Sequence, residues 1–383
     1  MTLNIVVATG TRAEYGLLRN LIKLIDSSKE FNLLLLVTGS HLTKKHGLTY
    51  KEIEKDNFEI TRKINIHLDR DQPIDISNST ALGIKGFSKA YRDLAPDLII
   101  VLGDRFELLS AVIPALFENI PIAHIHGGER TEGCIDEAIR HSITKFSNYH
   151  FVATETYKKR VIQLGENPER VFNVGGMGID SLESMKLISR EEIEKELKIK
   201  LLYKSLIVTF HPVTLEKSSS KKYIHELINS LRALENTTLI ITMPNADMEN
   251  EQIVSAWNEF AKKRKNTFLF KSLGQLRYFS LLKQVDGVIG NSSSGLLEVP
   301  YFKKGTINIG QRQKGRIKGN SIIDCEPNQK AITNAINHLY SETFQSRLQN
   351  VKNPYGDKGA SKKIFEIIKK LDFKNTQKSF YDL

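Results

Sequence analysis

Short apolar runs rich in β-branched residues alternate with helical patterns along the whole chain. Near-continuous apolar strands separated by helices are typical of parallel sheets that are covered on both faces. We therefore predict an α/β fold with two Rossmann-like, doubly wound domains that face each other across a cleft. The expected strands lie at Ile5–Ala8, Leu33–Thr38, Leu98–Leu102, Ile120–Ile125, His150–Ala153 and the start of Val171–Leu182, and then at Ser205–Phe210, Thr238–Met243, Thr267–Phe270, Gly287–Ile289 and Thr306–Ile309.

The chain has 383 residues, which is more than one hydrophobic core usually supports, so two domains are expected. The alternating pattern restarts after a charged helical stretch at Ser189–Lys200. We predict an N-terminal domain at residues 1–180 and a C-terminal domain at residues 181–355. Residues 356–383 contain an amphipathic helical pattern, which we expect to pack back on the N-terminal domain.

Ionisable residues gather between Val101 and Lys145, where two expected strands end and a helix begins. Packing in a core explains the apolar runs of this segment but not the acids, bases and cations between them. A parallel-sheet enzyme needs such groups where the strands end. We predict that this segment is catalytic, and its candidate residues are Asp104, Arg105, His124, His126, Glu129, Asp136, Glu137, Arg140 and His141.

Two strand–helix junctions have features of a phosphate-binding site. At the first, Gly10 permits a tight turn before a helix N-terminus, and Arg12 can bind phosphate oxygens. Its spacing matches neither a P-loop nor a dinucleotide fingerprint. The second junction carries three serines, including Ser292 and Ser293, and places Glu298 one turn further on, where it can accept from both ribose hydroxyls. A helix cap alone needs one serine, so we favour ligand binding at this junction.

Further polar candidates follow other strands of the second half. His211 and Asn245 each come at the end of an expected strand, and Arg312 lies in a basic loop with Lys314 and Arg316. A lone histidine is more often structural than catalytic, but its position at the end of a strand makes a role in the cleft more plausible.

The net charge of +11 raises the possibility of nucleic-acid binding, but the basic clusters are dispersed and lack interleaved aromatic residues. Excess positive charge also suits a small anionic substrate such as a nucleotide diphosphate. Neither a membrane-spanning apolar stretch nor a signal peptide is recognisable, and two cysteines are too few for a disulfide framework. We expect a cytoplasmic protein without nucleic-acid or membrane partners. No metal motif is present, and His124 with His126 is better explained by acid–base use.

Six motifs in collinear order, spanning roughly residues 5–319, resemble the hydrolysing UDP-N-acetylglucosamine 2-epimerases. These are the NeuC-like enzymes of sialic acid synthesis and their relatives of legionaminic acid synthesis. The motifs are GTRAEYG, GDRFELL, HIHGGERTEGCIDEAIRHSITK, FHPVT, GNSSSGLLEVP and NIGQRQKGR. The resemblance implies the two-domain glycosyltransferase-B type of fold, which agrees with the alternation of strands and helices. We also expect a homo-oligomer, either a dimer or a tetramer.

The resemblance implies a reaction on a UDP-N-acetylaminosugar, either UDP-N-acetylglucosamine or UDP-N,N'-diacetylbacillosamine. The C2 proton is removed and UDP is expelled in an anti elimination, leaving a 2-acetamidoglycal. Water then adds at C1 while a proton returns to C2 from the opposite face, which releases a mannosamine-configured sugar. This chemistry needs carboxyl groups and cations but neither a metal nor a redox cofactor.

The resemblance also assigns roles to individual residues. The matching acidic catalytic positions are Asp104, Glu129 and Glu137, with Asp136 able to share the role, and His211 matches a histidine that contacts the diphosphate. Arg140 would orient a carboxylate or contact the sugar. Positions that match nucleotide contacts are Arg12, Arg105, Asn245, Ser292, Ser293, Glu298 and Arg312.

Two other activities share the expected architecture. A non-hydrolysing UDP-N-acetylglucosamine 2-epimerase keeps UDP on its product, and a glycosyltransferase needs an acceptor. The sequence HIHGGERTEG favours the hydrolysing branch. The number of carboxyl groups between residues 104 and 137 speaks against a transferase.

Overall fold

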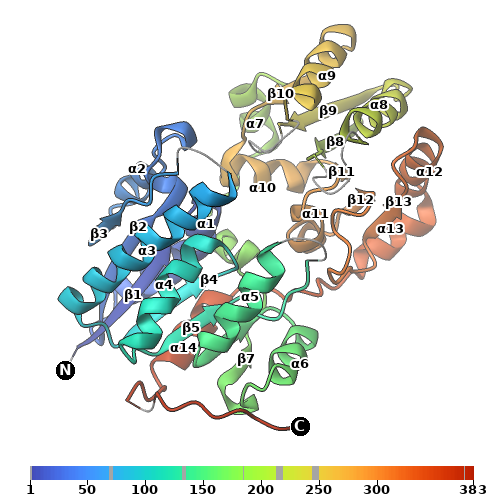
Figure 1. Cartoon of the computed structure of the whole chain (residues 1–383). Helices are drawn as coiled ribbons and strands as arrows, with labels where there is room; N and C mark the ends of the chain where they lie inside the picture. Colours follow the sequence, from blue (N-terminus) through green and yellow to red (C-terminus); the bar gives the residue numbers. More distant parts are fainter. Residues whose placement is uncertain are drawn as a thin grey trace. The chain divides into compact units, whose positions relative to one another are not determined.

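The computed structural model describes residues 2–68, 72–131, 135–183, 185–212, 219–243, 250–374 and 376–383. The chain divides into two compact units, one formed by Met1–Glu183 with Tyr355–Leu383 and the other by Ser184–Pro354. Each unit contains one sheet, and the strands of both sheets are parallel (Figure 1). The expected α/β class with two doubly wound sheets is therefore confirmed.

The sheet of the first unit has seven strands in the order β3-β2-β1-β4-β5-β6-β7. Their bounds are β1 Leu3–Thr9, β2 Phe31–Thr38, β3 Arg62–Ile64, β4 Leu98–Leu102, β5 Ile122–Ile125, β6 Tyr149–Val152 and β7 Val171–Asn173. The strand order reverses beside β1, which pairs with β2 on one side and with β4 on the other. Polar side chains that follow β1 and β4 therefore meet at a switch point of the sheet, where α/β proteins commonly bind ligands.

Helices cover both faces of this sheet because successive residues of a buried strand point to opposite sides. Ile5 and Val7 of β1 pack with α1 and α14, whereas Val6 and Ala8 pack with α3 and α4. The helices of the unit are α1 Arg12–Asp26, α2 Tyr50–Lys55, α3 Pro73–Leu94, α4 Phe106–Phe117, α5 Ile135–Phe146, α6 Glu155–Gln163 and α14 Ala360–Ile368.

The second unit has a six-stranded sheet in the order β10-β9-β8-β11-β12-β13. Its core forms around Trp257, with Leu206 and Val208 of β8 packed against α8, α9 and α12. The strands are β8 Lys204–Thr209, β9 Thr237–Thr242, β10 Thr267–Phe270, β11 Gly287–Gly290, β12 Gly305–Ile309 and β13 Ile322–Cys325. The helices are α7 Arg190–Leu197, α8 Ser219–Arg232, α9 Asn250–Lys263, α10 Gly274–Gln284, α11 Ser294–Leu297, α12 Gln329–Leu339 and α13 Glu342–Gln349.

The chain returns to the first unit at α14, and a buried carboxylate holds the start of that helix. Asp180 accepts from the backbone N–H groups of Gly359 at 2.6 Å and of Ala360 at 2.8 Å, and from that of Ser361. Gly359 has a φ of 103°, a left-handed conformation that favours glycine. These bonds satisfy backbone donors that have no partner inside the helix. Among the described residues, no helix is long and apolar enough to cross a membrane.

Candidate active site

The ends of β4 and β5 and the start of α5 bring acidic residues together in the first unit. Asp104 follows β4, Glu129 follows β5, and Asp136 and Glu137 lie in the first turn of α5. The two strands are neighbours, with Leu102 opposite Ile125, so the loops after them leave the same edge of the sheet. Sequence proximity and strand pairing together gather these side chains.

Arg140 of α5 is the centre of the cluster and is only 1% exposed. Its guanidinium donates to the Asp104 carboxylate, to Glu137 Oε2 at 2.7 Å, and to the Glu129 carbonyl and the Thr131 hydroxyl, both at 2.9 Å. Burial alone would lower the pKa of Arg140, but the charge of Asp104 and its hydrogen bond raise it. Arg140 is therefore a permanent buried cation that holds two carboxylates in place.

Glu137 is an ionised member of this cluster. It accepts from the Thr131 N–H at 2.6 Å, and its other oxygen lies 3.2 Å from His141 Nε2. Although burial opposes ionisation, the hydrogen bonds from Thr131, Arg140 and His141 lower the pKa of Glu137. A carboxylate with so many donors is a poor acceptor for a further proton.

Asp136 has the opposite environment. Burial raises its pKa, and the negative charge of Asp104 raises it further. None of the described residues hydrogen-bonds its carboxylate. Asp136 is therefore the carboxyl group of this helix turn that can carry a proton, which suits a general acid.

Glu129 is 8% exposed and lies beside an imidazole. His126 Nδ1 is 3.1 Å from Glu129 Oε1, and His126 Nε2 accepts from the Met177 N–H at 3.2 Å. A neutral His126 therefore has its proton on Nδ1, the nitrogen next to the carboxylate. His126 has left the strand, with a φ of 66°, which turns its ring toward Glu129. His126 therefore orients the Glu129 carboxylate, which is suited to accepting a proton.

His124, in contrast, is a structural histidine. It is completely buried in β5, its Nε2 lies 2.8 Å from the Gly103 carbonyl, and its Nδ1 lies 3.2 Å from the Thr144 hydroxyl. Burial lowers its pKa to about 3, so the ring is neutral. Within the described part of the chain, no group of three His, Cys, Asp or Glu side chains is placed to hold a metal ion.

A second buried acidic pair lies at the ends of β1 and β4, and the sequence pattern had not singled it out. Glu14 accepts from the Gly10 N–H at 2.7 Å, and burial together with the charge of Glu107 raises the pKa of Glu14 to about 8. Glu107 is completely buried and forms an ion pair with Arg105 at 2.9 Å. Arg12, expected at the same edge, pairs with Glu52 at 2.9 Å on the surface. Both arginine side chains remain about half exposed.

In the second unit, Asn291 connects the polar residues that follow β8 and β11. Its side chain accepts from the His211 N–H at 2.7 Å and donates to the His211 carbonyl at 2.9 Å. The Asn291 carbonyl accepts from Arg312 at 3.1 Å and from Gln313 at 2.9 Å. Close approach of the strands requires Gly290, because a Cβ there would lie 1.8 Å from the Thr209 carbonyl oxygen. His211 and Arg312 are thereby fixed at one edge of the sheet.

His211 is neutral and largely buried. It is 7% exposed, and burial and the charge of Arg312 lower its pKa to about 4. None of the described residues hydrogen-bonds its Nδ1. Asn245, expected to belong to the same group, lies outside the described residues.

The serine-rich junction opens a helix, as expected, but Glu298 lies just beyond that helix rather than on it. The helix α11 has only four residues, with Ser292 and Ser293 before it and Glu298 directly after it. Ser294 hydrogen-bonds Tyr278 at 2.6 Å, and burial raises the pKa of Glu298. The helix is short because Pro300 follows so closely, and proline cannot donate to a helical hydrogen bond.

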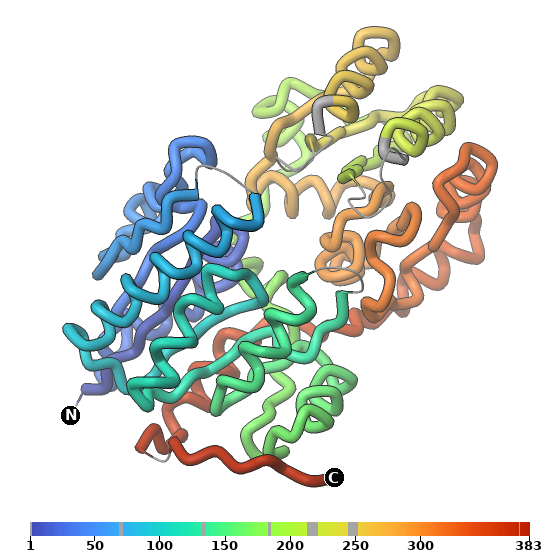
Figure 2. The backbone as a smooth tube through the Cα atoms, in the orientation of Figure 1, coloured from blue at the N-terminus to red at the C-terminus, as the bar shows by residue number. Residues whose placement is uncertain are grey.

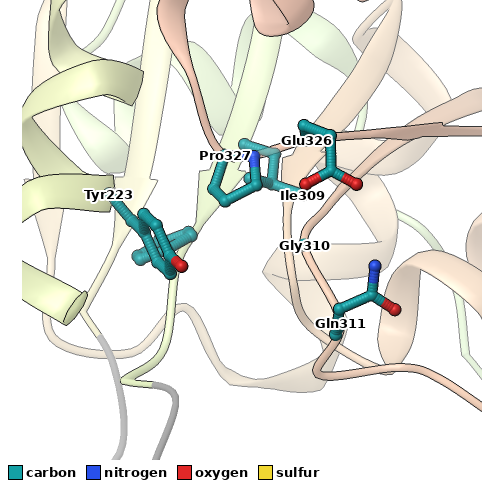
Figure 3. A pocket seen from close by; sticks show the side chains of 7 residues that line it. Tyr223, Ile309, Gly310, Gln311, Glu326 and Pro327 are labelled. Atoms are coloured by element: carbon teal, nitrogen blue, oxygen red, sulfur yellow. The ribbon is translucent and has the colours of Figure 1, made fainter. Parts of the chain in front are cut away.

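A small hollow lies at the same edge of this sheet (Figure 3). Tyr223 of α8 lies on one side of it, and Ile309, Gly310 and Gln311 lie on the other. Phe210, Glu326 and Pro327 complete the lining, which is therefore mixed apolar and polar.

The residues now assembled can be compared with known proteins. A family model described as UDP-N-acetylglucosamine 2-epimerase matches residues 23–369. The chain belongs to this family. The family resemblance that the sequence motifs suggested is thus confirmed.

Two curated relatives and one solved structure illustrate the similarity. A GDP/UDP-N,N'-diacetylbacillosamine 2-epimerase (hydrolyzing) from Campylobacter jejuni is 43% identical over 342 residues, covering 89% of this chain and 88% of its own. The polysialic acid biosynthesis protein P7 of Escherichia coli is 41% identical over 382 residues, covering 99% and 97%. The S. aureus MnaA–UDP co-structure has a TM-score of 0.81 at 18% identity and covers 100% of both chains. The similarity to this solved structure shows that the chain has the glycosyltransferase-B type of fold.

Proposed function

We propose that the protein is a hydrolysing UDP-N-acetylaminosugar 2-epimerase. Its substrate is UDP-N-acetylglucosamine or UDP-N,N'-diacetylbacillosamine, and its products are UDP and the free mannosamine-configured sugar. The observation that carries the proposal is the cluster around Arg140, where the pKa of Asp136 is raised by burial and by Asp104 while hydrogen bonds lower that of the neighbouring Glu137. Epimerisation at C2 needs one group that takes a proton and another that gives one from the opposite face.

The two groups best suited to these roles are Glu129 and Asp136. Glu129 is a buried carboxylate that faces Nδ1 of His126, and we assign it the removal of the C2 proton. Asp136 can hold the proton that returns to C2. In the first step the C2–H electrons form the C1–C2 double bond and UDP leaves with the C1–O electrons. In the second step the electrons of the C1–C2 double bond take the proton of the acid at C2, the oxygen of water bonds C1, and the proton that water loses is taken up by a neighbouring carboxylate. Arg140 pairs with the carboxylates of Asp104 and Glu137 beside this site.

The second unit supplies the groups for the nucleotide. His211 and Arg312, both held by Asn291, suit the diphosphate, which leaves with additional negative charge. Ser292 and Ser293 suit phosphate oxygens, and Glu298 suits the ribose hydroxyls. We keep Asn245, Arg12 and Arg105 as further nucleotide contacts. The proposed reaction is a proton transfer with elimination and hydration, so it needs no redox cofactor.

The relatives favour hydrolysis over the retention of UDP. The name of the Campylobacter jejuni relative specifies a hydrolysing enzyme for a diacetylbacillosamine nucleotide, and that of the Escherichia coli relative specifies polysialic acid biosynthesis. These names point to the two candidate substrates, which differ in the substituents at C4 and C6 of the sugar. A sialic or legionaminic acid pathway follows from the corresponding product.

A homo-oligomer and a cytoplasmic location stay predictions. Large apolar side chains are exposed on two helices of the first unit, with Ile74 of α3 66% and Phe117 of α4 77% exposed. Exposed apolar surface of this kind is compatible with a protein interface. The mass of the purified protein in light scattering would show whether a dimer or a tetramer forms.

Incubation with each UDP-sugar in deuterated water tests the function. We expect free UDP in an amount equal to that of the sugar, and deuterium at C2 of a mannose-configured product. A UDP-linked product would identify a non-hydrolysing epimerase, and a strict requirement for an acceptor would identify a transferase. Glu118→Gln serves as a matched control, because this exposed carboxylate lies outside the cluster and its loss should leave turnover unchanged.

A further inference from the structure

The last residues of the chain lie against the end of α5 that is opposite to the acidic cluster (Figure 2). The Tyr381 N–H donates to the Gly165 carbonyl at 2.9 Å, and Asn148 donates to the Thr376 carbonyl at 3.1 Å. The ring of Phe380 covers Gly165, where a Cβ would lie 2.2 Å from a ring carbon. The described tail, Thr376 to Leu383, is therefore bound along its length rather than merely trailing from the first unit.

Lys378 makes the central contact of this tail. Its ammonium donates to the carbonyls of Lys145 at 2.7 Å and Ser147 at 2.6 Å, with the Thr144 carbonyl at 3.4 Å. These carbonyls belong to the last turn of α5 and to the residue just after it. The last carbonyls of a helix have no N–H partner inside the helix, and the negative end of the helix dipole attracts a cation. Lys378 thus caps α5 from a distant part of the chain.

A buried carboxylate holds the ammonium in this position. Glu166 is 2% exposed, and its Oε2 lies 2.7 Å from Lys378 Nζ and 2.9 Å from His150 Nε2. Its Oε1 accepts from Lys145 of α5 at 2.7 Å. Burial lowers the pKa of Lys378 to about 8, so the ammonium keeps its proton at neutral pH. One carboxylate therefore connects the tail to both the backbone and a side chain of α5.

We infer that the C-terminal tail fixes the position of α5 and that Lys378 is a positioning residue for the reaction. This inference rests on the proposed function, because it takes α5 as the helix that carries Asp136 and Arg140. A helix of twelve residues is a stiff element about 18 Å long, so a displacement of one end reaches the other. A misplacement of about 1 Å in a catalytic site can reduce turnover about 100-fold.

The test compares Lys378→Met with Lys378→Arg and with the control Lys374→Met, which removes the charge of an exposed lysine in the preceding residues. We expect Lys378→Met to lower kcat about 10-fold or more while KM for the UDP-sugar changes by less than about twofold. Arginine should restore most of kcat because its several N–H groups can reach the same acceptors. Hydrogen exchange of the amides in 135–146 should become faster in Lys378→Met and stay unchanged in Lys374→Met.

Normal kcat and normal exchange in Lys378→Met would overturn the inference, and so would equal effects of the two methionine variants. If the wild-type protein releases no UDP from any UDP-sugar, the proposed function fails, but the exchange comparison still decides whether the tail holds α5. If Lys378→Met does not fold, Phe380→Ala takes its place. Faster exchange of α5 in that variant supports the inference, and unchanged exchange refutes it.

Discussion

Replacing Asp136 by asparagine tests the assignment of the proton donor. The change keeps the size of the side chain and removes only its ability to give and take a proton. General acid–base catalysis contributes about 10²–10⁴-fold, which corresponds to about 2.7–5.4 kcal/mol in the activation barrier. We therefore expect kcat of Asp136→Asn to fall by at least about 100-fold.

The same change should not weaken the fold. Because burial and Asp104 raise the pKa of Asp136, the folded protein binds its proton more tightly than the unfolded chain does. Stability contributed by this group is then present at low pH and is lost as pH rises from the ordinary value through the folded pKa. An asparagine at this position stays uncharged at neutral pH and avoids that loss. The free energy of unfolding of Asp136→Asn should therefore equal or exceed that of the wild type.

Glu137→Gln is the matched comparison, one residue further along α5. It removes a carboxylate that accepts from Thr131, Arg140 and His141. Hydrogen bonds to a charged group contribute about 1.5–3 kcal/mol each, but the side chain is 30% exposed, so water replaces part of them. We expect a loss of about 2 kcal/mol in the free energy of unfolding, with a smaller effect on kcat than in Asp136→Asn.

The assay measures release of free UDP under saturating UDP-sugar, and urea unfolding followed by circular dichroism measures stability. The reasoning fails if Asp136→Asn keeps kcat within about threefold of the wild type while Glu137→Gln loses activity but no stability. Such a result would make Glu137 the proton donor and would remove that role from Asp136.

Three further predictions concern other parts of the chain. Asp180→Ala removes the acceptor of three backbone N–H groups at the start of α14 and should lower the free energy of unfolding in urea by about 2–4 kcal/mol. Glu298→Ala should weaken UDP binding about 10- to 100-fold in calorimetry without a change in melting temperature, and unchanged affinity would remove Glu298 from the nucleotide site. Burial would raise the pKa of Glu166, but hydrogen bonds from His150, Lys145 and Lys378 hold it at about 2, so its stabilising contribution is present above 4.5 and is lost as pH falls toward 2. Glu166→Gln should therefore flatten the dependence of melting temperature on acid pH, and an unchanged slope would contradict this.

Most of the strands that the sequence predicts are buried on both faces, although the edge strands β7 and β10 are predicted as well. The apolar runs of the buried strands can be recognised without knowing which strands lie beside them, and Leu98–Leu102 is found with the same bounds as expected. The two strands without a prediction, β3 at Arg62–Ile64 and β13 at Ile322–Cys325, lie at sheet edges and carry charged residues. An edge strand has a partly solvated environment, so its composition resembles that of a loop.

The candidate site divides in the same way. Residue types at strand ends predict that Asp104 and Arg140 belong to one site, and the structure joins them directly. The sequence does not distinguish Asp136 from Glu137, because their difference depends on which donors lie opposite each side chain. The sequence does not single out Glu14 or Glu107, because each lies in the first turn of a helix. Acidic residues are common there simply because they interact favourably with the helix dipole. Only their burial shows that they are unusual.

The neighbouring acids of α5 show how one helix turn can shift the pKa values of two carboxyl groups in opposite directions. Successive helical residues point about 100° apart. This rotation directs Glu137 toward Arg140, Thr131 and His141, whereas Asp136 faces the charge of Asp104 without a compensating donor from the described residues. Arg140 contacts both sources of these shifts, because it donates to the Glu137 carboxylate and pairs with Asp104, whose charge raises the pKa of Asp136. A substitution that removed Arg140 would therefore release Asp104 and Glu137 from their shared donor, and the arrangement of carboxyl groups around Asp136 would be lost.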